Sequence, residues 1–180
     1  MRNLKNITAA FAVLVVATLA MAGCVTTETS MHASRAKLYT DITEVIGESS
    51  AVVEIEVQSQ EIVEDGTHTL STATVISAFQ PKGLAATLSS ATPVAAADKI
   101  IVRQLGSSEQ YGVPAPLLEI GNRYLLFLTP TTLEGDAGSQ FYIVGGTAGL
   151  YTSESGNYVH VKTEDGDNLP ATLTATELIG

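Results

Sequence analysis

The chain has 180 residues, of which 45% are hydrophobic, and its 9 basic and 19 acidic side chains give a formal net charge of −10. This charge argues against nucleic-acid binding, which needs clustered Lys and Arg to neutralise phosphates, and against flat binding to anionic lipid headgroups. Cys24 is the single cysteine of the sequence. No disulfide can therefore form within the chain, and a hydrophobic core has to supply its stability.

The first 23 residues have the three parts of an export signal. Arg2 and Lys5 give a short positive start, and an almost wholly apolar run follows at 7–22. This run of 16 residues is shorter than a membrane-spanning helix, which needs roughly 20 residues. Ala22 and Gly23 are small enough for a peptidase to approach the backbone. We therefore predict a signal peptide over residues 1–23, cleaved between Gly23 and Cys24.

Cys24 follows Met21-Ala22-Gly23, a spacing typical of bacterial lipoprotein signals, although Met21 stands where Leu is usual. Ordinary secretion is the alternative, because Ala20-Met21-Ala22 fits the small-x-small cleavage rule, but it would leave a free thiol near the new terminus. We expect a diacylglyceryl (palmitate-type) lipid on Cys24. Two acyl chains hold a protein firmly to a bilayer, at about 0.8 kcal/mol for each buried methylene. The predicted location is the extracytoplasmic face of the cell membrane.

The predicted mature chain has 180 − 23 = 157 residues and a net charge of 7 − 19 = −12, since the signal holds two of the basic residues. Residues 24–32 are small and polar and are typical of a flexible tether behind the lipid. The remaining length, 33–180, suits a single β-rich domain. The acidity of this domain favours solubility.

The segment 33–46 has the apolar spacing of a helix, with Gly47 as its stop. Its polar side carries Asp41 and Glu44 rather than a row of Lys. We therefore expect it to pack against a sheet, with contact to the membrane as the alternative. One apolar face of this helix would hold Leu38, Ile42, Val45 and Ile46.

Strand patterns occupy most of the remaining sequence. Val53, Ile55 and Val57 alternate with polar residues, and Asp65-Gly66 is a strong hairpin signal before a return strand at 67–79. The nearly continuous apolar run at 121–128 predicts a central strand. Long loops are expected at 84–98 and 106–116, and further strands are expected at 99–105, 141–144 and 158–161.

These elements predict a mainly β fold. Five to six strands preceded by one α-helix suit a small OB-like β-barrel. A β-sandwich is the alternative, because the order in which strands pair cannot be read from periodicity.

Several sequence blocks also carry a resemblance to known proteins. They are Ala51–Val57, Ser71–Val75, Val102–Gly106, Pro116–Leu128 and Val144–Tyr151. Together they resemble uncharacterised exported lipoproteins of Gram-positive, especially actinobacterial, bacteria. They also resemble the netrin/TIMP-like branch of OB barrels, in which a Gly-x-x-Tyr-Leu-Leu-Phe strand recurs.

The TIMP resemblance implies inhibition of metalloproteases, and Cys24 argues against it. In those inhibitors a free N-terminal cysteine binds the protease zinc through its amine and carbonyl, with disulfides around it. Here Cys24 is expected to carry lipid, and the sequence has no second cysteine. The resemblance therefore speaks to the fold and hardly to function.

The sequence offers few candidate catalytic groups. It has no Gly-x-Ser-x-Gly elbow, no His-Glu-x-x-His motif and no P-loop. His32 falls at the edge of the tether, and His68 follows the hairpin turn, where we expect it to be exposed. His160 is expected on the solvent face of its strand, together with Tyr158 and Lys162. A His68–His160 pair would not make a metal site, because two ligands do not suffice.

Two turn regions have compositions that also occur in ligand sites. Glu164-Asp165-Gly166-Asp167-Asn168 could suit Ca²⁺ but lacks EF-hand spacing, and turn chemistry explains it as well as the acidic turns at 64–66 and 134–136. Gly145-Gly146-Thr147-Ala148-Gly149 precedes an apolar strand-like piece rather than a helix. A phosphate cradle needs a helix N-terminus, so we expect a tight turn here.

The functional prediction is a non-enzymatic binding or scaffolding role at the cell envelope, with no cofactor and no metal. The partners would be the membrane, through Cys24, and an envelope protein or ligand of unknown identity. The first alternative is a hydrolase acting on an envelope polymer, which needs a cleft with two close acids or an acid and a histidine. The second is ligand capture for a transporter. Candidate surface contacts, unless packed in the core, are Tyr111, Tyr124, Tyr142, Tyr151 and Tyr158.

Overall fold

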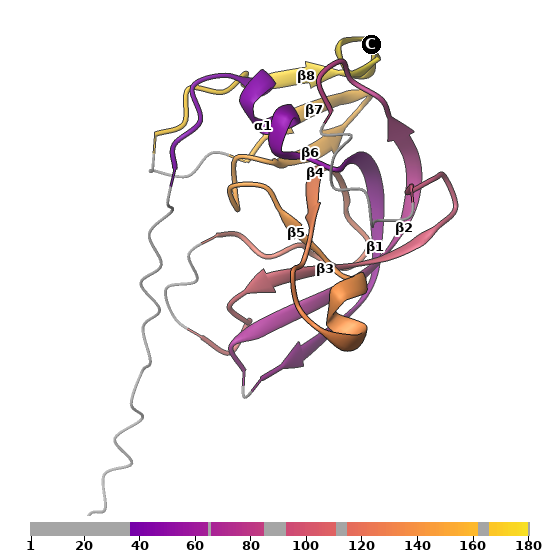
Figure 1. Cartoon of the computed structure of the whole chain (residues 1–180), viewed down its shortest axis with the longest axis vertical. Helices are drawn as coiled ribbons and strands as arrows, with labels where there is room; N and C mark the ends of the chain where they lie inside the picture. Colours follow the sequence, from indigo (N-terminus) through magenta and orange to yellow (C-terminus); the bar gives the residue numbers. More distant parts are fainter. Residues whose placement is uncertain (1–36, 65, 85–92, 111–114, 162–165, 180) are drawn as a thin grey trace, which may run out of the picture.

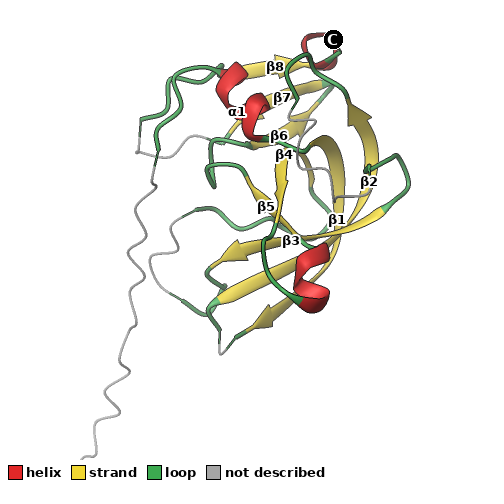
Figure 2. Cartoon of the chain, viewed as in Figure 1, coloured by secondary structure: helices red, strands yellow, loops and turns green. Residues whose placement is uncertain are grey.

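The computed structural model describes residues 37–64, 66–84, 93–110, 115–161 and 166–179. The predicted signal peptide, the tether, Cys24, His32 and Tyr111 lie outside these residues. Within them the chain forms eight strands, one α-helix and two short 3₁₀ helices (Figures 1 and 2). In chain order they are α1 (Ile42–Glu48), β1 (Ala51–Val63), β2 (His68–Phe79), β3 (Lys99–Leu105), β4 (Arg123–Pro130), η1 (Gly135–Ser139), β5 (Phe141–Ile143), β6 (Leu150–Glu154), β7 (Asn157–His160), β8 (Thr172–Thr174) and η2 (Ala175–Leu178).

Five of the described strands close into a barrel, as the OB-like prediction requires. The order is β1-β2-β3-β5-β4, and β1 also pairs with β4 to complete the ring. β1 is 13 residues long and has register shifts at Glu54/Ile55 and Val57/Ser59. Such bulges bend a strand. The first half of β1 thereby pairs with both β2 and β4, and its second half pairs with β2 alone.

The remaining strands extend the sheet beyond the barrel. β6 pairs with β4, β7 with β6, and β8 with β7, all antiparallel. α1 lies with β6, β7 and β8 at one end of the molecule, and β3 lies toward the other end (Figure 1). The fold is thus a barrel with a second layer of structure at one end.

β4 explains why the run at 121–128 ends in consecutive apolar residues rather than in an alternating pattern. Leu126 and Leu128 face the barrel interior, whereas Leu125 and Phe127 face a second core beneath α1, β6 and β7. Both faces of β4 are therefore buried, and the predicted central strand is confirmed.

The helix begins later than its sequence pattern predicts, and Gly47 is not its stop, since α1 continues to Glu48 and Ser49 is its C-cap. Asp41 caps α1 by accepting hydrogen bonds from the backbone amides of Thr43 and Glu44. Tyr39, two residues before this cap, is held by residues 167–168 and cannot join the helix, because its N–H donates to Asp167 Oδ1 at 2.9 Å and its carbonyl accepts from the Asn168 amide. Leu38 consequently lies outside the helix and is exposed, while Val45 and Ile46 pack in the second core. Packing of this helix against the sheet is thus confirmed.

No helix among the described residues combines the length and hydrophobicity needed to cross a membrane.

Candidate functional site

A cavity of about 540 Å³ opens at one mouth of the barrel. It lies where β3 and β5 begin and β4 ends, and the loop containing η1 completes its wall. Its volume falls within the range of small-molecule sites, and the mouths of β-barrels commonly hold such sites. The lining residues are Pro93, Val94, Asp98, Lys99, Ile100, Pro130, Thr131, Gly138, Ser139, Gln140 and Phe141.

Strand pairing creates this cavity. β5 has only three residues and meets β3 at a single pair, Val102↔Phe141. Lys99 and Ile100 precede that pair, so they have β2 beside them on one side and no β5 residue on the other. The opening left between β3 and the end of β4 is the cavity.

Gly138 allows the η1 loop to fold closely over this opening. A Cβ at this position would lie 2.7 Å from the carbonyl oxygen of Leu133. Thr131 fixes the same loop, since its hydroxyl donates to the Ala137 carbonyl and its amide donates to the Gln140 carbonyl at 2.9 Å.

Three apolar side chains contribute to the lining, and together they are called the cavity floor: Val94, Ile100 and Phe141, of which the last two are nearly buried. Ile100 and Phe141 belong to the barrel core, and Val94 packs against that core. The polar groups lie around this floor, so the cavity combines an apolar surface with a polar rim.

A buried arginine, paired with the exposed Glu64, supports the side of the cavity that Gln140 forms. Arg103 is 5% exposed, its Nη2 pairs with Glu64, and its Nη1 donates to Gln140 Oε1 at 3.3 Å. Its Nε has no hydrogen-bond partner within the part of the chain that the structure describes. A buried guanidinium needs a counter-charge, and Glu64 supplies it from the β1–β2 turn.

His68 joins this cluster, in contrast to the prediction that it is exposed. Its side chain is only 21% exposed, and its Nδ1 lies 2.9 Å from Glu64 Oε2 and 2.9 Å from the Thr67 hydroxyl. Burial, and then the Arg103 charge, lower the pKa of His68, while Glu64 partly opposes them.

The prediction that His160 faces solvent is wrong. His160 is 8% exposed, its ring packs 4.7 Å from that of Tyr151, and its Nε2 lies 3.1 Å from the Thr147 carbonyl. The alternation along β7 is real, but the face that carries Tyr158 and His160 is the buried one. Tyr158 itself packs in the second core, which also holds residues of β8 and η2. β7 does not pair with β2, so His68 and His160 are not neighbours in the sheet.

The other candidates have structural roles. Tyr124, Tyr151 and Tyr158 are buried, which confirms core packing, and Tyr142 is half-buried. The segment 144–149 forms the expected tight turn between β5 and β6. Glu164 and Asp165 lie outside the described residues. No group of three His, Cys, Asp or Glu side chains suited to a metal occurs in the described ranges.

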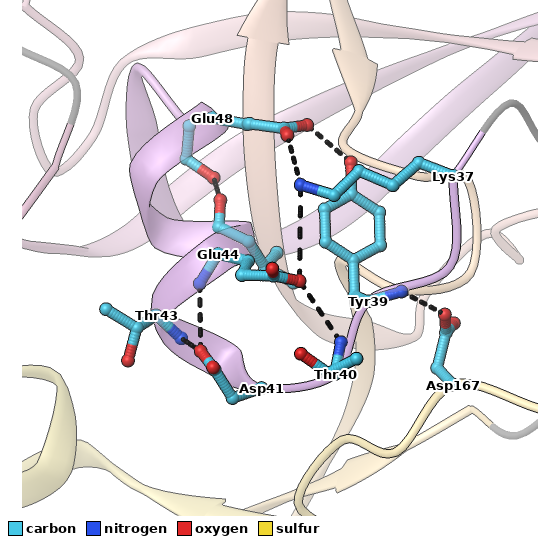
Figure 3. Close-up of polar contacts among 10 residues, drawn as sticks. Lys37, Tyr39, Thr40, Asp41, Thr43, Glu44, Glu48 and Asp167 are labelled. Carbon is cyan, nitrogen blue, oxygen red and sulfur yellow. Dashed lines mark hydrogen bonds and ion pairs between the residues drawn. The ribbon is translucent and has the colours of Figure 1, made fainter.

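A second polar cluster joins the start of the domain to its C-terminal segment (Figure 3). Lys37 Nζ lies 2.8 Å from Glu48 Oε1 and also sits 4.8 Å from the ring centre of Tyr39. The Tyr39 hydroxyl donates to the other oxygen of Glu48. The hydrogen bond from Lys37, and then that from Tyr39, lower the pKa of Glu48. We call Lys37, Tyr39, Glu48 and Asp167 the N-terminal clasp.

Sequence reasoning did not find the cavity or the clasp. Both depend on residues brought together from distant segments, such as Lys99 with Ser139 and Tyr39 with Asp167. No local pattern marks such pairs.

The described residues therefore define an OB-like β-barrel domain with a cavity at its mouth. Comparison with known protein families finds no match for this chain, and comparison with curated proteins finds none either.

Proposed function

We propose that this protein is a lipid-anchored bacterial envelope protein whose barrel is a non-enzymatic binding domain. The observation that carries the proposal is the cavity of about 540 Å³ at the barrel mouth, with its apolar floor and polar rim. Pockets that bind small molecules have this combination, because apolar surface provides affinity and a few polar groups provide orientation.

The composition of the lining favours binding over hydrolysis. Asp98 is the one acid among its described residues, and no histidine lines it. Glu64 and His68 do lie together, but on the β1–β2 hairpin, where Glu64 also balances Arg103. Acid–base hydrolysis needs its groups to meet within a substrate cleft.

The proposed anchor is Cys24, and the clasp supports this arrangement. Tyr39 ties the start of the domain firmly to its C-terminal segment. The clasp residues and the cavity lining are different parts of the fold. Attachment through the N-terminus would therefore engage no residue of the described cavity lining.

Mass spectrometry of the protein from native membranes tests the anchor. We expect a mature terminus at Cys24 with a mass increase for a diacylglyceryl group, and we expect Cys24→Ala to abolish that modification. An unmodified terminus beginning at Gly23 would contradict the proposal.

Native mass spectrometry after incubation with an envelope extract tests the cavity. We expect a bound species on the wild type that is lost in Ser139→Trp, which places an indole in the cavity. The matched control is Asp136→Trp, which adds the same ring on η1 outside the lining. Equal binding to all three proteins would show that the cavity is not the binding site.

A further inference from the structure

We propose that the cavity selects a small amphipathic ligand with a carboxylate head, which Lys99 binds, and an apolar body, which lies on Phe141. This inference rests on the proposed binding function and names the chemistry of the ligand.

Most polar side chains of the rim already form hydrogen bonds with other groups of the protein. The hydroxyls of Thr131 and Ser139 donate to the backbone carbonyls of Ala137 and Asp136. Gln140 Oε1 accepts from Arg103. These groups shape the wall of the cavity, and their hydrogen bonds within the protein leave few free to bond a ligand.

The Asp98 side chain forms a hydrogen bond within its own turn. Its Oδ2 accepts from the Ala95 amide at 2.7 Å, and its backbone N–H donates to the Ala95 carbonyl at 3.2 Å. This turn is also hydrogen-bonded to β2, because the Asp98 carbonyl accepts from the Val75 amide. Asp98 thus fixes the entrance to β3 and holds Lys99 at the rim.

Lys99 is the cation of this rim, and no ion pair engages it among the described residues. Three other cations of the described chain are paired, namely Lys37 with Glu48, Arg103 with Glu64 and Arg123 with Glu56, whereas Lys82 has no ion pair among the described residues but lies outside the cavity lining. In a chain with 19 acids, a lysine left without an acidic partner beside a cavity is a specific electrostatic feature. It attracts an anionic group and repels a cationic one.

The cavity floor determines the chemistry of the ligand body. Ile100 and Phe141 continue the barrel core, and Val94 extends the same surface. An alkyl or aromatic body on this surface would gain roughly 25 cal/mol for each Å² of apolar area removed from water. A carboxylate joined to such a body reaches both Lys99 and the floor.

Isothermal titration calorimetry with three probes of equal chain length tests this. The probes are octanoate, octanamide and octylamine, whose head groups are an anionic carboxylate, a neutral amide and a cationic ammonium. We expect octanoate to bind the wild type about fivefold more tightly than octanamide, as for a solvent-accessible ion pair, and octylamine to bind most weakly. Added salt should reduce the difference in affinity between octanoate and octanamide, because it screens the ion pair.

Two lysine variants assign the effect. Lys99→Gln should reduce the octanoate affinity to that of octanamide. Lys82→Gln, which removes a positive charge outside the cavity lining, should leave the affinity unchanged. Asp98→Asn keeps a side-chain oxygen for the turn and removes a negative charge, so it should strengthen octanoate binding.

Equal affinity of octanoate and octanamide, with both lost in Ser139→Trp, would overturn the carboxylate inference and leave the cavity as a binding site. Equal effects of Lys99→Gln and Lys82→Gln would also overturn it. Failure of all three probes to bind the wild type would overturn the ligand class, and the envelope-extract experiment decides the role of the cavity separately.

Discussion

At the scale of the residue, Gly145 is the position at which the β5–β6 turn packs closely against Tyr39 of the clasp. Its φ is +60°, and a Cβ there would lie 2.8 Å from Ala148 Cβ and closer still to the Tyr39 ring. Only a residue without a side chain fits this position, because both the backbone conformation and the space exclude a Cβ.

Gly145→Ala should therefore destabilise the protein by about 2–4 kcal/mol, the sum of a left-handed backbone penalty and overpacking. Gly146→Ala is the matched control, since its φ is +65° but nothing lies within 4 Å of the added Cβ. It should cost only about 1–2 kcal/mol. Chemical denaturation measures both, and equal losses would show that contact with Tyr39 is unimportant.

His68 makes stability depend on pH near neutrality. Burial and Arg103 lower its pKa in the folded state below the ordinary value of 6.5. The unfolded chain therefore binds the proton first. The contribution of His68 is complete above pH 6.5 and is lost as the pH falls through the folded-state pKa.

We expect the free energy of unfolding to fall between pH 8 and pH 5.5 and to fall less in His68→Gln. His160 is present in both proteins, so the difference between their pH dependences of unfolding comes from His68. The carboxylates with lowered pKa values, such as Glu48, act below 4.5 and do not contribute in this interval. The same loss of stability in both proteins would contradict the assignment.

At the scale of the element, α1 depends on its cap because it is only seven residues long. So short a helix is marginal alone, and its stability comes from packing and from satisfied end groups. Asp41 satisfies two backbone amides at its start.

Asp41→Ala should cost about 1 kcal/mol in thermal or chemical unfolding. Glu134→Ala is the control, because Glu134 is the exposed acid at the N-cap of η1 and its side chain makes no cap hydrogen bond. It should change stability by less than about 0.5 kcal/mol. A similar loss in both variants would mean that charge rather than capping is responsible.

At the scale of the whole molecule, stability should be greatest where the barrel closes. Residues 52–56 of β1 pair with both β2 and β4, and β4 is buried on both faces. β8, in contrast, has three residues and pairs only with β7.

Native-state hydrogen exchange should therefore show the slowest amides in the centres of β1 and β4 and much faster exchange in β8. Exchange of the barrel amides should approach the global free energy of unfolding, measured on the same sample. Slower exchange in β8 than in β1 would contradict the barrel as the stable core.

Local sequence patterns predicted much of the fold. The alternation at Val53, Ile55 and Val57 and the predicted strand at 99–105 match β1 and β3, because burial of one strand face leaves a period of two. β6 and β8 were not among the predicted strands: only the apolar start of β6 was noted, and the three residues of β8, Thr172–Thr174, are too few for a periodic pattern.

What the sequence determined by itself is the type of local structure: apolar periodicity, turn residues and helix stops act between near neighbours. The tertiary structure decided which face of each element is buried and what meets across the barrel. His160 alternates as predicted yet is buried, since it packs against Tyr151 of β6. Lys99 becomes part of a cavity only because β5 is too short to pair along all of β3, and pairing between distant strands is a property that no local pattern encodes.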